Sequence, residues 1–530
     1  MLSEIVLPHT GAPARDALRD GSQGSGVGPS GTGYRRFTRS GPLALILGLL
    51  GFAVAVTGSW IPSLWGDEAA SIMSAERPWS SLFAMLGHID SVHGAYYVFL
   101  HVWIDLFGAS AFSVRLPSAI ATGLATAGLV VLAHRLGGAR LAAVSGLVYM
   151  VIPRVTYMGI EAREYAFTAT CAVWLTVLLV QLVRTQSRSR LPWLGYGLAL
   201  AASVYVFLYL AMMVLVHAAV LLSVTRERRM LRRWLLATVL AVLLAGPAIY
   251  FDLSESGQIS FLADRVTVDF MGFFVGQWFW TVPFAIVAWL CIAGALGAFA
   301  RRWVHDRRHR RAHGLSPRSP SFAGVAVAWS VIPPALLVSV NVVHAVYAAR
   351  YLSFVTPAVA MLIAAGLCLL MRRWMVAVAV CALVALAAPS YLHQRGPFGM
   401  PGGSDWSEVA ATISSNARPG DAIVFTEGGS PSQNPRSAKY LYPQAFQGLD
   451  DVTLVTPYAQ TTGIWDRTEP VSRAADRLAD GNGRVWLVLH RGTGTPAHPA
   501  QLTQLETLGY GITSTIPENH DVVYLMQRTP

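Results

Sequence analysis

Eleven apolar segments constrain this sequence more than any other feature. A helix needs ~20 apolar residues to cross the ~30 Å hydrocarbon core of a bilayer, and most of the segments approach or exceed that length. Hydrophobic residues make up 54% of the chain and charged residues 13%, whereas soluble domains carry about 25% charged residues. The sequence therefore predicts an α-helical polytopic membrane protein with about eleven transmembrane helices, of which the long eighth is expected to be tilted or broken. The segments lie at 42–61, 113–135, 140–158, 165–183, 191–206, 208–224, 232–251, 271–299, 321–340, 351–370 and 374–390.

Arginine marks alternate connections between these segments. By the positive-inside rule the basic connections are cytoplasmic, so we expect a multi-pass protein of the cell inner (plasma) membrane with a cytoplasmic N-terminus and an extracytoplasmic C-terminal part. The net charge of +11 is spread over these connections and forms no stripe on one domain, which argues against nucleic acid as a partner. The basic connections are 35–39, 135–140, 184–190, 226–233, 301–318 and 372–373; the connections that hold acids, His and aromatics are 62–112, 159–164, 252–270 and 341–350.

The segment 94–108 is apolar but is not expected to span the bilayer. It is short and carries His101 and Asp105. Counting it as a span would move every later basic connection to the outer side, against the positive-inside rule. We therefore predict an amphipathic helix that lies at the outer membrane–water interface.

The two ends of the chain differ from its apolar middle. Residues 1–40 are rich in Gly, Ser, Pro and Arg and lack apolar periodicity, so a disordered cytoplasmic tail is expected. Short strand-like and helix-like runs alternate over 391–530, which predicts an extracytoplasmic α/β domain with a largely parallel sheet. Strands are expected at 422–426, 452–455, 484–489 and 521–526, and helices at 405–417, 434–446, 470–480 and 498–508.

Two adjacent acids follow the first apolar segment directly. Asp67 and Glu68 begin the outer loop 62–112, and a carboxylate at the edge of the bilayer suits a general base. The plainer alternative makes Asp67 the N-cap of a short helix that begins at Glu68. The two interpretations are compatible.

The same loop continues with a cluster of imidazoles and a carboxylate, namely His88, Asp90 and His93. Together with the acids before them they could bind a divalent cation such as Mg²⁺ or Mn²⁺, and Asp67, Asp90 and His93 are the tentative metal ligands. Alternatively, Asp90 and His93 form a hydrogen-bonded pair that holds the loop. The spacing is not that of a recognised closed metal site.

Two arginines in other outer connections suit a phosphate group. Arg163 lies between Glu161 and Glu164, and three charges between two spans are costly unless they are paired or bind a ligand. A guanidinium group can bind two phosphate oxygens at once. The alternative for Arg163 is an internal ion pair with a neighbouring glutamate. Arg350 begins a later span, where it could reach a lipid phosphate or merely extend to a headgroup.

The ordered set of these residues resembles the GT-C glycosyltransferases, closest to the protein mannosyltransferase and lipid A aminoarabinose transferase branch. The resemblance implies a GT-C-like transmembrane domain over 41–390 with a catalytic first outer loop at 62–112. It is carried by the Asp67-Glu68 pair, the run His88-x-Asp90-x-x-His93-Gly-x-Tyr-Tyr, Phe107-Gly-x-Ser, Arg115-Leu-Pro-Ser, Glu161-Ala-Arg-x-Tyr, and Arg350-Tyr-Leu with Pro357.

This resemblance also implies roles for the candidate residues. Asp67 would take the proton of the acceptor hydroxyl, and Glu68 would support its position or a metal. Asp90, with His88 and His93, would lie on the acceptor or metal side, while Arg163 and Arg350 would hold the carrier phosphate. Many relatives carry His-Pro-Pro where this chain has His93-Gly94-Ala95, so the loop is less rigid here.

The predicted function is transfer of a sugar from a polyprenyl-phosphate carrier to an acceptor of the cell envelope, with inversion and Asp67 as the base. The resemblance favours mannose, with arabinofuranose or another pentose as the alternative, and the acceptor is a glycan, glycolipid or protein. Two other classes stay open: a lipid or sugar transporter, and a non-catalytic scaffold for envelope assembly. A transporter would place ionisable groups near the middle of its spans, whereas here they concentrate at the outer ends.

Overall fold

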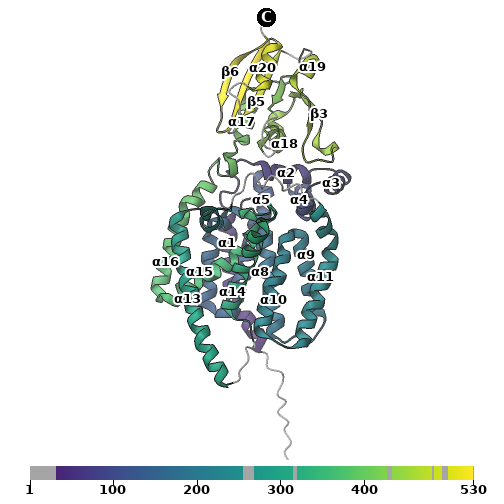
Figure 1. Ribbon diagram of the computed structural model, residues 1–530. Helices are drawn as coiled ribbons and strands as arrows, with labels where there is room; N and C mark the ends of the chain where they lie inside the picture. Colours follow the sequence, from purple (N-terminus) through teal and green to yellow (C-terminus); the bar gives the residue numbers. More distant parts are fainter. Residues whose placement is uncertain are drawn as a thin grey trace, which may run out of the picture. The chain divides into compact units, whose positions relative to one another are not determined.

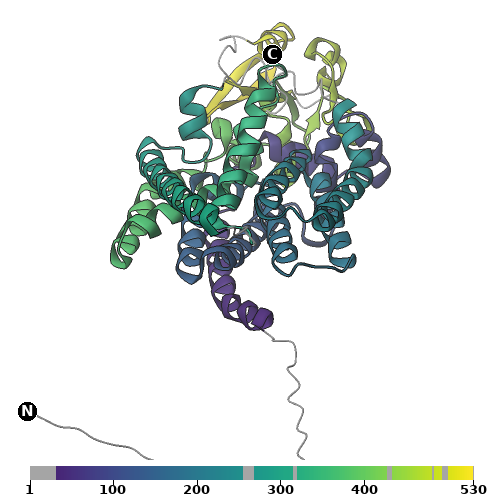
Figure 2. The same ribbon diagram turned by 60° about the horizontal axis from the view of Figure 1, so that its bottom comes forward.

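The computed structural model describes residues 32–254, 268–313, 319–426, 433–479, 483–491 and 499–528. From Ser40 onward the chain forms one compact unit, in which a helical bundle carries an α/β domain at one end (Figures 1 and 2). Residues 1–31 of the expected disordered tail lie outside the described residues. The rest of that tail is helical, because α1 spans Thr32–Val56 and the arginines near its start are good helix formers.

The apolar helices of the bundle match the segments expected from the sequence. Within the described ranges, seven helices are long and apolar enough to cross a membrane, and four apolar helices are shorter. The long ones are α5 (Ala111–Gly137), α8 (Tyr165–Arg184), α11 (Arg228–Ser254), α13 (Val282–His313), α14 (Phe322–Asn341), α15 (Thr356–Leu370) with the preceding 3₁₀ helix η5 (Ala349–Val355), and α16 (Arg373–Gln394). The shorter ones are the part of α1 from Ser40, α6 (Ala139–Val151), α9 (Leu191–Val206), and α10 (Met213–Val224) with the 3₁₀ helix η2 (Leu208–Met212).

Two of the expected spans are interrupted. The segment at 140–158 divides at Pro153, where Ile152 is extended and a second helix, α7 (Pro153–Met158), begins with proline in its first turn. The segment at 271–299 contains a π-helical turn, η4 (Gly272–Gly276), before α13 begins at Val282. The expected break in the eighth segment is thereby confirmed, and residues at these interruptions are free to build a site rather than continue a helix.

Four short elements follow α1 and lie at the end of the bundle that faces the α/β domain (Figure 1). They are α2 (Gly66–Ala75), α3 (Trp79–Leu86), the 3₁₀ turn η1 (Ser91–His93) and α4 (Gly94–Phe107). The 14 residues of α4 extend over about 21 Å, which is shorter than the hydrocarbon core. As expected from the sequence, α4 is a separate helix of less than spanning length.

The C-terminal domain is α/β, but its main sheet is mixed rather than largely parallel. Strand β1 pairs in parallel with β2 and β5, whereas β7 runs antiparallel to both β5 and β6. The sheet order is β2-β1-β5-β7-β6, and a separate antiparallel pair joins β3 and β4. The expectation failed because β6 was not foreseen, and its short connection to β7 forces an antiparallel hairpin. The strands are β1 (Ala422–Phe425), β2 (Asp450–Asp451), β3 (Leu454–Thr456), β4 (Arg467–Thr468), β5 (Arg484–His490), β6 (Tyr510–Pro517) and β7 (Asp521–Arg528).

The helices of this domain are short and lie close to the expected positions. The segment at 434–446 divides into an α-helix and a 3₁₀ helix, and so does the segment at 470–480. The helices are η6 (Pro401–Gly403), α17 (Trp406–Asn416), α18 (Ser437–Leu441), η8 (Pro443–Phe446), η9 (Tyr458–Gln460), η10 (Val471–Arg473), α19 (Ala475–Ala479) and α20 (Ala500–Thr507).

The α/β domain is fixed to the elements around α2 by hydrogen bonds and a shared apolar core. Arg77, at the end of α2, donates to the carbonyl of Thr461 at 2.8 Å and also to that of Gly463. The backbone N–H of Leu64 donates to the Tyr442 hydroxyl at 3.0 Å. Buried side chains of α2 and α4 share one cluster with those of α17, β1 and β5. This domain therefore helps to position the loop that carries the candidate catalytic acids.

Candidate active site

The two adjacent acids sit in the first turn of α2, which begins at Gly66. Trp65 is the N-cap residue and supplies no side-chain hydrogen bond, so Asp67 is a helical residue and not the cap. The N-cap interpretation of Asp67 is wrong for this reason. Carboxylates in a first turn are favoured by the helix dipole, and neighbouring positions on a helix point in different directions. Asp67 and Glu68 consequently have different surroundings.

Asp67 forms an ion pair with Arg350. Arg350 Nη1 lies 2.6 Å from Asp67 Oδ2, and the two side chains are 27% and 16% exposed. Arg350 belongs to η5, the irregular turn that precedes α15, so a residue far along the chain reaches the start of α2. The pair is thus assembled by the fold, and its partial exposure leaves room for a ligand to approach both groups.

Arg163 is more deeply buried and bonds to several groups of the outer loop. Its Nη1 donates to Ser71 Oγ at 3.2 Å, to the Tyr97 hydroxyl at 3.4 Å and to the carbonyl of Asp67 at 3.4 Å. Its Nη2 lies 2.8 Å from His93 Nε2. These bonds tie α2 to α4 and hold Asp67 in place. The structure therefore brings Arg163 and Arg350 to the same acid, but only Arg350 is substantially open.

The side chains of His93 and Asp90 do not pair with each other, although the backbone N–H of His93 donates to the Asp90 carbonyl at 3.0 Å. His93 Nδ1 lies 3.0 Å from Glu164 Oε1, and burial alone would raise the pKa of Glu164, but His93 and Arg163 lower it to about 2. Asp90 has a positive φ of 65° and accepts a hydrogen bond from the Tyr97 hydroxyl at 2.5 Å. The expected Asp90–His93 hydrogen bond therefore exists only through the backbone, and each side chain contacts a different partner.

The side chains expected to share a metal do not form one site. Asp67 faces Arg350, Asp90 faces a tyrosine, and His93 faces Glu164. His88 is exposed, and its Nδ1 contacts the carbonyl of Ala84 in the preceding helix α3. In the part of the chain that the structure describes, no group of three or more His, Cys, Asp or Glu side chains could hold a metal ion. The tentative ligands Asp67, Asp90 and His93 are therefore not brought together at one point.

Glu68 is buried in an ion pair with Arg115 of α5. Its Oε1 and Oε2 accept from Arg115 Nε at 2.7 Å and Nη2 at 2.6 Å, and Oε1 also accepts from the backbone N–H of Ala162 at 2.9 Å. Arg115 donates further to the carbonyls of Ser59 and Pro62 at 2.7 and 2.8 Å. Neither side chain is exposed. Glu68 is thus placed to position the start of α2 rather than to contact a substrate.

Glu161 was not among the residues expected in the site, although it lies in the same charged connection as Arg163. It is 1% exposed, accepts from the Tyr157 hydroxyl at 3.3 Å, and has one oxygen without a hydrogen-bond partner among the described residues. Burial raises the pKa of Glu161 to about 8, and Arg350 and Asp67 are its nearest charged influences. The sequence showed several charged residues in the connection 159–164, but it did not indicate whether Glu161 or Glu164 keeps its proton.

The raised pKa of Glu161 predicts a pH effect on stability. Between pH 4.5 and about 8, Glu161 keeps its proton in the folded state but has lost it in the unfolded state. Its contribution to the free energy of unfolding is therefore complete below pH 4.5 and is lost as the pH rises to about 8. We expect Glu161→Gln to become more stable relative to the wild type across this range, by about 1 kcal/mol per pH unit. Thermal unfolding of both proteins in detergent from pH 5 to 8 measures this difference, and parallel curves would contradict it.

A family model and several solved structures are similar to this chain. Residues 95–251 match the family model described as dolichyl-phosphate-mannose-protein mannosyltransferase. This segment includes Arg115, Glu161 and Arg163, but neither Asp67 nor Arg350. A search of curated proteins finds no match for the chain.

Three solved structures found in the comparison are the following. The structure of ArnT from Cupriavidus metallidurans bound to undecaprenyl phosphate has a TM-score of 0.52 and 15% identity, and covers 94% of this chain and 98% of that one. Its apo state has a TM-score of 0.52 and 16% identity, with 91% and 98% covered. The arabinofuranosyltransferase AftD from Mycobacteria has a TM-score of 0.45 and 16% identity, with 93% and 41% covered. The chain therefore has the fold of the similar ArnT structures, and its residues 95–251 match a mannosyltransferase family model.

Proposed function

We propose that this protein transfers a sugar from a polyprenyl-phosphate carrier to a hydroxyl group of an extracytoplasmic acceptor. The observation that carries the proposal is the partly exposed Asp67–Arg350 ion pair of 2.6 Å, which joins a base to a phosphate-binding cation. Both kinds of comparison involve a polyprenyl phosphate: the matched family is named for dolichyl-phosphate mannose, and the similar ArnT structure holds undecaprenyl phosphate.

The arginines supply donors for a phosphate. One nitrogen of Arg350 faces Asp67, while its Nε has no hydrogen-bond partner among the described side chains. The same holds for Arg163 Nε and for the Tyr165 hydroxyl. Buried polar atoms are normally satisfied, so several orphan atoms at one place are consistent with a bound polar ligand. We assign binding of the carrier phosphate to Arg350. Arg163 holds α2 in position through its hydrogen bonds to Ser71 and to the carbonyl of Asp67.

The reaction is a single displacement. The acceptor hydroxyl oxygen bonds to the anomeric carbon while the bond from that carbon to the phosphate oxygen breaks, which inverts the configuration. The hydroxyl proton passes to Asp67, and the carrier leaves as polyprenyl phosphate. A phosphate leaving group needs charge stabilisation rather than a general acid, and a positioned guanidinium supplies it.

The side of the membrane follows from the positions of the basic connections. The arginine-rich end of α13 lies at the end of the bundle opposite to α2 and the α/β domain (Figure 1). With basic connections in the cytoplasm, Asp67 and the α/β domain face the outside. An enzyme there cannot use cytoplasmic nucleotide sugars directly, so a lipid-linked donor is required. Mannose is the first candidate because of the matched family's name, and a pentose such as arabinose is the second.

Transfer of labelled sugar tests the proposal. Membranes with and without the protein are incubated with polyprenyl-phosphate mannose or polyprenyl-phosphate arabinofuranose, each labelled in the sugar, together with a cell-envelope extract as the acceptor source. We expect one donor to give label in the extract that depends on the protein and to release unlabelled polyprenyl phosphate. Absence of protein-dependent transfer from both donors would contradict the proposed donor class.

A further inference from the structure

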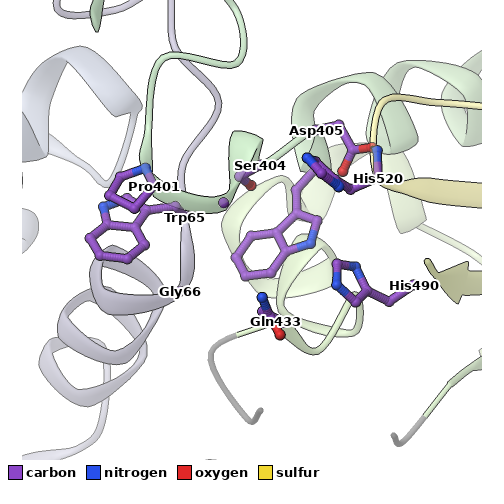
Figure 3. Close-up of a pocket in the computed structure, with 10 residues that line it drawn as sticks. Trp65, Gly66, Pro401, Ser404, Asp405, Gln433, His490 and His520 are labelled. Carbon is purple, nitrogen blue, oxygen red and sulfur yellow. The ribbon is translucent and has the colours of Figure 1, made fainter. Parts of the chain in front are cut away.

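A second polar pocket lies where the α/β domain meets the start of α2, apart from the Asp67–Arg350 pair. It has a volume of about 160 Å³ and is lined by side chains from both parts of the chain (Figure 3). Trp65 borders it from the bundle side, whereas Gln433, His490 and His520 border it from the α/β domain. Trp406 of α17 also lines it. Trp65 and Gly66, which line the pocket, directly precede Asp67 in the chain.

The strands of the α/β domain hold the histidines of this pocket in defined positions. His490 ends β5 and is paired in register with Asp521, the first residue of β7. Its Nδ1 lies 2.7 Å from Asp521 Oδ1, so Nε2 is the ring nitrogen that can face a ligand. The Asp405 carboxylate accepts from the backbone N–H groups of His520 and Asp521 at 2.6 and 2.8 Å. His490 is therefore pre-oriented, as expected of a binding residue.

A glycine turn forms the wall between this pocket and the bundle. Gly402 and Gly403 in η6 have positive φ values of 76° and 62°, which a residue with a side chain rarely adopts. A Cβ atom on Gly403 would lie 2.8 Å from Asn519 Nδ2 and from His520 Nε2. The absence of side chains thus lets the turn pack against His520 and keeps the pocket open.

The chemistry of the lining favours a neutral, hydroxyl-rich ring. Among the described residues that line the pocket none is Arg or Lys, and the carboxylate of Asp405, which lines it, would repel an anion. Imidazole and amide side chains both donate and accept hydrogen bonds, which suits hydroxyl groups. Trp65 and Trp406, which are 8% and 3% exposed, add apolar surface that can contact the C–H groups of a sugar ring. The volume is below the about 300–1,000 Å³ of pockets for drug-sized ligands, so it fits one small unit.

We propose that this pocket binds one sugar ring of the acceptor glycan, next to the acceptor hydroxyl that approaches Asp67. That the ligand is an acceptor rests on the proposed function. The affinity of the pocket for a saccharide does not depend on catalysis. His490 and Gln433 supply the hydrogen bonds, and the indole rings supply the packing surface. A GT-C site that selects its acceptor needs such contacts away from the reacting atoms.

Direct binding of simple glycosides tests this site. The purified full chain in detergent is titrated with methyl α-D-mannopyranoside and with methyl α-D-arabinofuranoside, and binding is followed by saturation-transfer NMR. We expect saturable binding of at least one glycoside. His490→Ala and Gln433→Ala are each expected to weaken it about tenfold by removing a hydrogen bond to the ligand. Gln447→Ala, a change at an exposed glutamine of the same domain, is the matched control and should bind as the wild type does.

The outcomes separate the pocket from the catalytic proposal. Asp67→Asn should keep glycoside binding, since Asp67 does not line the pocket. Failure of the wild type to bind either glycoside overturns the inference, and so does unchanged binding by both Gln433→Ala and His490→Ala. Gln433 is exposed, so its substitution tests the site even if His490→Ala unfolds the domain. If the wild type transfers no sugar but binds a glycoside, and the pocket variants weaken that binding, the proposed function is wrong and the saccharide-binding pocket is retained.

Discussion

Replacement of Asp67 by Asn is expected to lower sugar transfer by a factor of about 10²–10⁴, the usual contribution of a general base. The amide keeps the size of the carboxylate but cannot accept the hydroxyl proton. Because the wild-type side chain is only 16% exposed and pairs with Arg350, the substitution also leaves that guanidinium without its counter-charge. The measurement is the initial rate of transfer from the active polyprenyl-phosphate donor in membranes with matched amounts of each protein.

A matched control uses another acid at the same end of the bundle. Asp105 lies on α4, is 67% exposed, and has His101 at 3.4 Å as its ion-pair partner. Asp105→Asn removes the same charge without touching the candidate site, so its rate should stay within about twofold of the wild type, as expected of an exposed substitution. A similar loss in both variants would indicate a general effect of charge rather than a base at Asp67.

The kinetic constants distinguish the two roles that Asp67 could have. If Asp67 accepts the proton, kcat falls while the KM for the donor changes little. If Asp67 only holds Arg350 against the carrier phosphate, the KM for the donor rises and kcat is largely kept. Transfer by Asp67→Asn at the wild-type rate would exclude both roles and with them the proposed mechanism.

The membrane bundle could be predicted because one physical length decides it. The thickness of the hydrocarbon core fixes how many apolar residues a span needs, and the apolar segments in the sequence coincide with the helices found. By the same length criterion, the segment that forms α4 was predicted not to span the membrane. The break at Pro153 was not predicted, although a residue before proline is disfavoured in the helical region.

The α/β domain was predicted less well because strand pairing is not local. The strand β6, Tyr510–Pro517, contains several β-branched residues, yet its buried and exposed positions do not alternate regularly. It is an edge strand, so it lacks the continuous apolar run that made β5 recognisable. Once β6 is missed, the following hairpin is missed too, and β7 is assigned the wrong direction.

The candidate site was predicted in part. Alternation of the connections placed Asp67, Arg163 and Arg350 at one end of the bundle, and the structure brings them together. The partners of His93 and Glu68 could not be predicted, because both depend on how neighbouring helices pack. Nothing in the sequence near Glu68 indicates that its two oxygens face an arginine at the start of α5.

That buried pair leads to the second large effect, on stability. Arg115→Ala leaves Glu68 as an unpaired charge in the core, and removal of one member of such a pair typically costs about 3–5 kcal/mol of unfolding free energy. The carbonyls of Ser59 and Pro62 lose their donor at the same time. Thermal unfolding in detergent measures the loss. Arg477→Ala, at an exposed pair with Glu469 in the α/β domain, is the control and should cost at most about 1 kcal/mol.

A further variant, Glu68→Gln, decides whether Glu68 is a catalytic or a positioning residue. A catalytic Glu68 would lose transfer on substitution to Gln while the unfolding temperature stays near that of the wild type. The geometry indicates that Glu68 positions the start of α2, which carries Asp67. In that case the transfer rate and the unfolding temperature of Glu68→Gln should both fall. The double variant Glu68→Leu, Arg115→Met removes both charges, so it should regain part of the stability that Arg115→Ala loses. If Arg115→Ala is as stable as Arg477→Ala, the buried pair does not hold α2 in place, and the position of Asp67 must depend on Arg163 and the α/β domain instead.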